Sequence, residues 1–486
     1  MRPQSDGLKK GIIAVNSPIS HGLEIGRRAL RAQQAALSAT SQNIANANTP
    51  GFSRRQANLE SAASGVPGGI GSGVDVASIV RKRSRFLDAQ VRVEQQVLGR
   101  WEALEEAMGS VEVVFNDLAG AGSSEAGTVF NETSGVGLSG SLSRFWNAWQ
   151  DLANVPESGA ARAVIRQEAV FLANILHQYN TQLRDTQVEL DRSLMDEVDQ
   201  INGIIDQLAA INTEIPSSKF EGGNAAELED RRDQLIEQLS RKVDISVVER
   251  DNGQVSVMLS GHNLVEIDRA VHLRMRHFSQ NGLSAARVFF ADDGSPAAVR
   301  EGRLQGLMEA RDEVIPDLIV RLDQLAKGMV EEVNLVHRGG FGADGSSRVD
   351  FFDAGKTSAG DIAVDESILQ DLDNIAASAD GNMGDNGTAL AISALRDKRM
   401  LDGNSTTAES FYNELLGEVG ARSKEAQTMA ENHRLFDSQL ENRRQSVQGV
   451  SLNEEATQLI LFQRAYQAAA RTVSIVDNLL EVTINL

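Results

Sequence analysis

The chain has 486 residues, a formal net charge of −21 and no cysteine. Its length allows about two to four domains. Its acidic balance argues against a nucleic-acid-binding protein, because phosphate contacts require a basic face. The lack of cysteine excludes disulfides, thiol catalysis and cysteine-based metal sites. There is no apolar run of the roughly 18 residues that a membrane span needs, so we expect no membrane insertion.

Residues 1–20 are predicted to be a disordered extension, and Val15 is a candidate alternative start. Their apolar run at 12–15 is too short for a cleaved secretory signal. From residue 23 the pattern becomes helical. Leucine or isoleucine recurs every seven residues with alanines between, which predicts a helix with a narrow seam. These seam residues are Leu23, Leu30, Leu37 and Ile44.

The helix is predicted to end near Asn46 and Asn48, before Pro50 and Gly51. A Pro-Gly pair suits the second and third positions of a type II turn. Residues 61–80 are rich in glycine and predict a linker with short strands. The basic cluster that follows is Arg81, Lys82, Arg83 and Arg85. We interpret it as a solvated or acid-paired patch.

Two discontinuous segments, 81–242 and 302–449, carry most of the helical periodicity and predict a central helical domain. Within it, residues 86–118 form a strong helix, 121–140 form a loop, and Pro216 ends a long apolar seam. Between the two segments, residues 243–301 change to alternating, β-rich runs with hairpin-type turns. They predict an inserted antiparallel β-subdomain. Residues 339–386 are rich in Gly, Asp, Ser and Asn and predict an irregular loop.

The final stretch carries a second apolar stripe at helical spacing. Ser451 and Glu454 suit a capping box at its start. One helix cannot bury such a face alone, so we expect a partner. The stripe comprises Leu452, Leu459, Phe462, Tyr466, Val473, Val476, Leu480 and Ile484. Taken together, these patterns predict a mainly α fold, an elongated antiparallel helical bundle or coiled coil, with a small inserted antiparallel β-subdomain.

No catalytic constellation is evident, and we predict no enzymatic activity, cofactor or metal site. The seven histidines do not show metal-ligand spacing. Phosphate-loop, nucleophile-elbow and dinucleotide-binding patterns are also lacking. Paired carboxylates lie on polar helix faces, where solvation explains them.

Two terminal runs resemble the signatures of the axial proteins of the bacterial flagellum, the rod, hook and hook-associated family. The first spans residues 41–52 and includes Asn43, Asn46, Asn48, Pro50 and Gly51. The second spans residues 463–471. The resemblance implies that residues 21–60 and 450–486 pair as a terminal coiled coil that lines the inner tube of the flagellum. The chain resembles the family over residues 20–486.

Interior runs at 145–154, 230–236, 309–316 and 449–455 resemble the hook-associated branch more than a hook or rod protein. This implies a structural subunit that joins hook to filament by helical self-assembly. Longer relatives carry an outer β-domain after the stretch that matches residues 350–353, and here residues 355–386 leave no room for one. The alternatives are a hook or distal rod protein and, from another class, a secreted coiled-coil effector or adhesin.

The resemblance also implies partners and a location. The partners would be further copies, the hook protein, the second junction protein, and an export chaperone on the C-terminal helix. The chain would leave the cell through the flagellar type III secretion apparatus, without a cleaved signal, and reside in the extracellular flagellum. Alanine-rich terminal helices bury little apolar area, and this burial does not offset the conformational entropy that is lost when they become ordered. We therefore expect both ends to fray in the free monomer and to fold on assembly.

Overall fold

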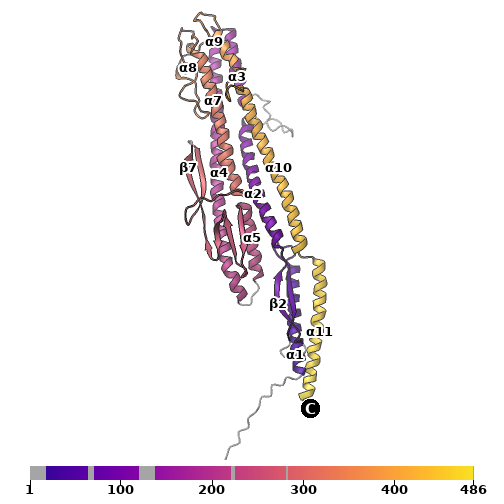
Figure 1. Ribbon diagram of the computed structural model, residues 1–486. Helices are drawn as coiled ribbons and strands as arrows, with labels where there is room; N and C mark the ends of the chain where they lie inside the picture. Colours follow the sequence, from indigo (N-terminus) through magenta and orange to yellow (C-terminus); the bar gives the residue numbers. More distant parts are fainter. Residues whose placement is uncertain (1–17, 64–70, 120–136, 221–224, 281–282, 485–486) are drawn as a thin grey trace, which may run out of the picture.

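The computed structural model is a long molecule in which a terminal helix pair continues from a larger helical bundle (Figure 1). It describes residues 18–63, 71–119, 137–220, 225–280 and 283–484. The predicted fold class is confirmed. Among the described helices, none is long and apolar enough to cross a membrane.

The terminal unit consists of two helices and a hairpin. Helix α1 spans Pro18–Ala45 and α11 spans Leu452–Ile484. Strands β1 (Arg55–Ser61) and β2 (Val74–Arg81) pair antiparallel and pack on α1. At its first turn α11 has only a long capping contact, 3.5 Å from the Glu454 N–H to the Ser451 hydroxyl.

The central unit is built from long helices that run side by side (Figure 1). Apolar residues at helical spacing fill its core, which includes Trp146, Trp149, Phe145 and Tyr179, all nearly or fully buried. The helices are α2 (Arg85–Ala119), α3 (Leu138–Asn154), α4 (Gly159–Phe220), α5 (Ala226–Lys242), α6 (Arg303–Glu309), a π-helical turn (Ala310–Val314), α7 (Ile315–His337), α9 (Gly387–Ser393) and α10 (Ala408–Gln448).

The prediction that Pro216 ends a helix is wrong, because α4 continues through it to Phe220. Proline lacks an N–H, so the carbonyl of Asn212 loses its helical donor. Gln254 supplies a replacement, because its side-chain amide donates to that carbonyl at 3.1 Å. The helix therefore keeps its hydrogen bonding with help from a neighbouring turn.

Two boundaries also differ from the sequence predictions. Residues 18–20 belong to α1 rather than to a disordered extension, since proline is well tolerated in the first turn of a helix. Residues 138–140 open α3 rather than extend the loop. Strand β2, in contrast, agrees with the short strands predicted within the linker at 61–80. The remainder of the extension and most of the 121–140 loop lie outside the described residues.

The inserted β-region contains two small antiparallel sheets on the flank of α4 and α5 (Figure 1). The four-stranded sheet has the order β3-β4-β5-β6. Strands β7 and β8 pair separately in register from Leu273↔Phe290 to Gln280↔Leu283. The strands are β3 (Ile245–Glu249), β4 (Val255–Leu259), β5 (His262–Glu266), β6 (Arg269–Ala270), β7 (Leu273–Gln280) and β8 (Leu283–Phe290).

The irregular stretch 339–386 folds over the far end of the bundle, with α8 (Glu366–Gln370) as one short helix. His337, at the end of α7, anchors this cap. Its Nδ1 donates to the Val349 carbonyl at 2.8 Å, and its Nε2 accepts the Ala376 N–H at 2.9 Å. The ring is therefore neutral, and burial lowers the pKa of His337 to about 4.

This buried neutral histidine predicts an acid-sensitive cap. An unfolded histidine has a pKa of about 6.5, so the neutral folded form contributes stability that is complete above pH 6.5 and lost as the pH falls toward 4. The loss should approach about 3 kcal/mol. Urea unfolding between pH 7 and pH 4 measures it, with the exposed His272 replaced by Gln as a control. A His337→Gln variant with the same pH dependence as the parent would contradict this prediction.

Candidate assembly interface at the terminal coiled coil

Helices α1 and α11 run antiparallel and pack closely at Gly26. A Cβ at Gly26 would lie 2.6 Å from Cγ2 of Val473, and one at Gly22 would lie 3.6 Å from Val476. Near the other end, Asn43 of α1 meets Glu455 of α11. The narrow seam expected from the alanine-rich sequence is thus present, and any larger residue at Gly26 would force the helices apart.

None of the described residues that were predicted to form the seam is fully buried. On α1, the buried apolar side chains are Ala32, Ala36 and Ala39, whereas the four heptad residues Leu23, Leu30, Leu37 and Ile44 are half-buried. On α11, Ala469 is buried and Tyr466 is 38% exposed. Half-buried α11 residues are Leu459, Phe462, Val473, Val476 and Leu480. Leu452 is 52% exposed and lies outside the seam, and Ile484 ends the helix.

A second apolar stripe on α11 faces away from α1. It recurs every seven residues at Leu461, Ala468, Ile475 and Val482. Leu461, Ile475 and Val482 are 61%, 60% and 59% exposed. A helix that is apolar on two separate faces suits an assembly of more than two helices. This stripe lies on a different helix face from the predicted seam, so the periodicity of the seam alone does not reveal it.

Asn43, from the N-terminal signature, ties three segments together. Its side-chain oxygen accepts the Arg55 N–H at 2.8 Å, while its amide nitrogen donates to the Arg55 carbonyl and to Oε2 of Glu455, both at 2.9 Å. Both Asn43 and Glu455 are 1% exposed. Arg54 neutralises the buried carboxylate at 2.7 Å. An asparagine fits this position because it offers a donor and an acceptor at once.

The other signature residues shape the loop after α1. The Phe52 N–H donates to the Thr49 carbonyl at 3.2 Å and Gly51 has φ +77°, which fits the predicted type II turn. Gln234 of α5 donates to the Pro50 carbonyl at 2.7 Å. Asn46 accepts a hydrogen bond from Thr49, and Asn48 is exposed. The loop therefore docks on the central unit.

A cluster of ion pairs forms the joint between the terminal and central units. Helix α5 presents acids at Glu229, Asp230, Asp233 and Glu237, which lie on one helix face. Arg81 pairs at 2.8 Å with each of Glu229, Asp230 and Asp233. Arg83 pairs with Asp233, and with Asp88 at 2.9 Å. The basic cluster is thus acid-paired through Arg81 and Arg83, and Lys82 is exposed.

Burial and pairing act in opposite directions in this joint. Burial alone would lower the pKa of Arg81, but its three carboxylate partners raise it above the ordinary value. Likewise, burial would raise the pKa of Asp233, but Arg83, Arg232 and Arg81 hold it below the usual range. Arg81 and Asp233 are therefore both charged at neutral pH.

A groove of about 950 Å³ opens beside the joint, between the signature loop, α5 and the end of α10. It is lined by polar and charged side chains, among them Lys82, Gln238, Glu441 and Gln445. Small-molecule sites are usually apolar with a few convergent polar groups, so this lining does not indicate a substrate pocket.

Comparison with known proteins bears on the terminal coiled coil and on the central unit. Residues 23–52 match the family described as flagella basal body rod protein, and residues 444–486 match the flagellar basal body rod FlgEFG protein C-terminal family. Residues 123–352 match the flagellar hook-associated protein FlgK helical domain. The chain is 31% identical to flagellar hook-associated protein 1 of Bacillus subtilis (strain 168), over 96% of this chain and 97% of the relative.

The chain belongs to the flagellar hook-associated protein 1 family. It is also 23% identical to flagellar hook-associated protein 1 of Escherichia coli (strain K12), covering 94% of this chain and 98% of that protein. The protein of the same name from Salmonella typhimurium is 30% identical, over 70% of this chain and 60% of its own length. The resemblance inferred from the sequence signatures is confirmed.

A solved structure shares the fold. The flagellar hook junction protein FlgK from Burkholderia pseudomallei matches with a TM-score of 0.63 and 13% identity, covering 74% of this chain and all of that one. This likeness supports the mainly helical architecture of this family member.

The ion-pair joint predicts a large loss of folding stability when one of its acidic side chains is removed. Replacing Asp233 by Asn leaves Arg81 and Arg83 short of a buried partner, and breaking such a pair costs about 3 kcal/mol. A carboxylate with a depressed pKa contributes stability above about pH 4, and this is lost as the pH falls through its folded pKa. The difference from the parent should therefore be large at pH 7 and smaller at pH 2.5.

Urea unfolding at the two pH values measures this difference. Replacement of the exposed Asp251 by Asn is the matched control, with no expected effect at either pH. An Asp233→Asn variant as stable as the parent at pH 7 would show that the joint does not depend on this acid.

Proposed function

We propose that this chain is a structural subunit of the bacterial flagellum that forms the junction between hook and filament by helical self-assembly. Family membership supports the flagellar role, and the relatives' name supports the hook-associated position. The structural observation that carries the proposal is the second apolar stripe of α11. At about 60% exposure, its large side chains need a partner that a single chain does not supply.

We assign that partner to neighbouring copies and to the adjoining axial proteins, namely the hook protein and the second junction protein. An apolar heptad stripe packs against another apolar heptad stripe, so a coiled-coil helix of a neighbouring subunit fits this surface. The stripe and the α1 seam lie on different faces of one helix. A copy that docks on the stripe therefore makes a heterologous contact, and such contacts build an open helical assembly.

The competing functions fit less well. A hook or distal rod protein would not need a long multi-helix middle, whereas α2, α4, α7 and α10 dominate this chain. A secreted coiled-coil effector or adhesin would explain the helices but not family matches at both ends. We propose no enzymatic activity, because assembly surfaces account for the features described here.

We further propose that a chaperone covers α11 before export and that the chain leaves through the flagellar type III secretion apparatus to the extracellular flagellum. The exposed stripe supports this, because an apolar helix face free in the cell favours aggregation. A chaperone groove that accepts one amphipathic helix would mask it. The residue-level assignment of the α1 and α11 seam to assembly is part of the same proposal.

Deletion of the gene tests the proposed position. We expect cells that build hooks of normal length and shed unattached filament protein into the medium, because the hook lacks its adaptor. Electron microscopy of the cell surface and assay of the medium measure both. Complementation with the parent gene is the control, and normal attached filaments in the deletion strain would contradict the junction role.

Charge substitutions on α11 test the assembly surfaces separately. An unpaired charge cannot be buried at low cost, so Leu459→Asp and Leu480→Asp should break the seam and Ile475→Asp should block docking of a neighbour. All three should abolish filament attachment while the central unit stays folded by circular dichroism. Gln467→Asp, an exposed change between the two stripes, is the control. Normal filaments with Ile475→Asp would remove the second stripe from the interface.

A further inference from the structure

The outer side of the β7–β8 hairpin has a charge opposite to that of the molecule as a whole. The chain has a net charge of −21, yet no acidic residue occurs between Asp268 and Asp292. Successive residues of a strand point to opposite sides, and directly paired residues share a side. The inner side carries the buried Leu273 and Val288 and packs on α4. The outer side, which we call the arginine face, carries Arg274, Arg276, Phe278, Arg287 and Phe289.

Two of these arginines face each other directly across the strands. Arg276 and Arg287 are register partners, and like charges at opposed positions destabilise a sheet. The Arg276 guanidinium lies over the Phe289 ring, 4.8 Å from its centroid. The Arg287 guanidinium lies over the Phe278 ring at 4.9 Å. Stacking restrains these planar groups and leaves N–H donors at their edges available for carboxylates.

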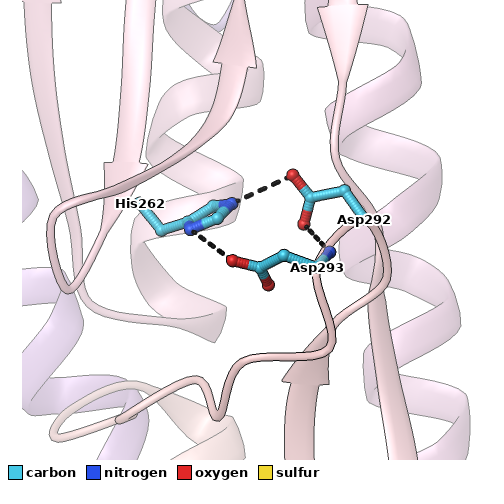
Figure 2. Close-up of side chains that lie close together, drawn as sticks. All are labelled: His262, Asp292 and Asp293. Carbon is cyan, nitrogen blue, oxygen red and sulfur yellow. Dashed lines mark hydrogen bonds and ion pairs between the residues drawn. The ribbon is translucent and has the colours of Figure 1, made fainter.

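No carboxylate of the described chain neutralises the arginine face. Its three arginines are exposed, and none of them forms an ion pair with a described residue. The two acids that follow β8 are oriented elsewhere. Figure 2 shows Asp292 and Asp293 turned toward opposite ring nitrogens of His262, at 3.2 Å and 3.9 Å. The arginine face is therefore a cationic surface that the described part of the chain leaves unpaired.

Helix α4 presents a complementary surface. At helical spacing it places four acids and one arginine on the side opposite the buried Leu190 and Leu194, and all five are exposed. None of the four acids forms an ion pair with a described residue. This acidic stripe comprises Asp185, Glu189, Arg192, Asp196 and Asp199. Two exposed apolar side chains, Val188 and Met195, lie beside it.

From these two surfaces we infer that the arginine face of one copy binds the acidic stripe of α4 in a neighbouring copy. The inference rests on the proposed function, because it requires copies that assemble side by side. Three positive charges would meet a net of three negative charges. Arginines two residues apart on a strand are separated by about 7 Å, and acids four residues apart on a helix by about 6 Å. Several ion pairs can therefore form together.

The composition of the contact also fits a protein partner. Val188 and Met195 would lie against the two phenylalanines, so the contact would combine apolar burial with charge pairing. Guanidinium groups that are already held by stacking lose less freedom when they bind a carboxylate. The two surfaces lie on different elements of the same chain. Such a heterologous contact can repeat from copy to copy and extend an open assembly.

Charge exchange between the two surfaces tests the inference in a strain that lacks the parent gene. Arg276→Glu with Arg287→Glu, and separately Glu189→Arg with Asp196→Arg, should each bring like charges together. Each pair should lower the number of filaments that stay attached under a fixed shear by at least ~10-fold. All four substitutions in one chain should restore attachment. The control is Arg399→Glu, which changes an exposed arginine ahead of α10 and should match the parent.

Electron microscopy counts the attached filaments, and circular dichroism verifies that every variant is folded. Attachment at the parent level in the chain with Arg276→Glu and Arg287→Glu would overturn the inference. So would a loss that the four-substitution chain does not restore, because that result assigns the arginines to another anionic partner, such as a lipid surface or a nucleic acid. Normal filaments in the strain without the gene would instead refute the proposed function.

Thermal unfolding of the purified chain separates docking from a purely structural role. Arg276→Glu alone places a negative charge opposite Arg287, so the unfolding temperature should not fall. A marked fall would assign the arginines to the stability of the hairpin and overturn the inference.

Discussion

The rest of the molecule depends on a helix that a single chain cannot cover. Helix α11 is apolar along two stripes, and α1 covers only one of them. Even the covered stripe stays partly exposed. The buried positions of α1 include the small residues Gly26, Ala32, Ala36 and Ala39, and Gly26 packs closely on Val473. The small residues let the helices pack closely but bury little apolar area. We therefore propose that the pair is incomplete by itself and that neighbouring helices complete it.

The second constraint is the joint that fixes the terminal pair to the central bundle. It consists of three polar contacts. Asn43 bridges α1, β1 and α11, the Pro50–Gly51 turn docks on α5, and Arg81 at the end of β2, with Arg83 just after it, pairs with the acidic face of α5. Such a network contributes less net stability than its number of contacts suggests, because burial opposes every charge. The network instead fixes the orientation of the terminal unit relative to the central unit, since charged pairs with fixed geometry specify one orientation. An axial subunit requires that, because an error in angle would be repeated at every copy.

The sequence predicted the elements better than the contacts between them. Heptads at Leu23 and Leu30, the Pro50–Gly51 turn and the alternating β-rich runs each depend on neighbours a few residues away, so local periodicity was enough. The prediction that Pro216 ends a helix was wrong because Gln254 donates to the Asn212 carbonyl, which Pro216 leaves without its helical donor. Only the tertiary fold brings Gln254 near this carbonyl. The pairing of Arg81 with Asp233 could not be predicted for the same reason. The sequence shows two charged runs but does not show how far apart they lie in space. The family resemblance, in contrast, depended on residue identity at both ends and was confirmed by relatives over nearly the whole chain.

Amide hydrogen exchange on the free monomer and on the assembled junction tests the central claim most directly. If α1 and α11 are incomplete alone, amides at residues 30–44 and 459–480 should exchange rapidly in the monomer and become protected on assembly, while those of α4 and α7 are protected in both. Strong protection of both terminal helices in the monomer, unchanged on assembly, would contradict the account.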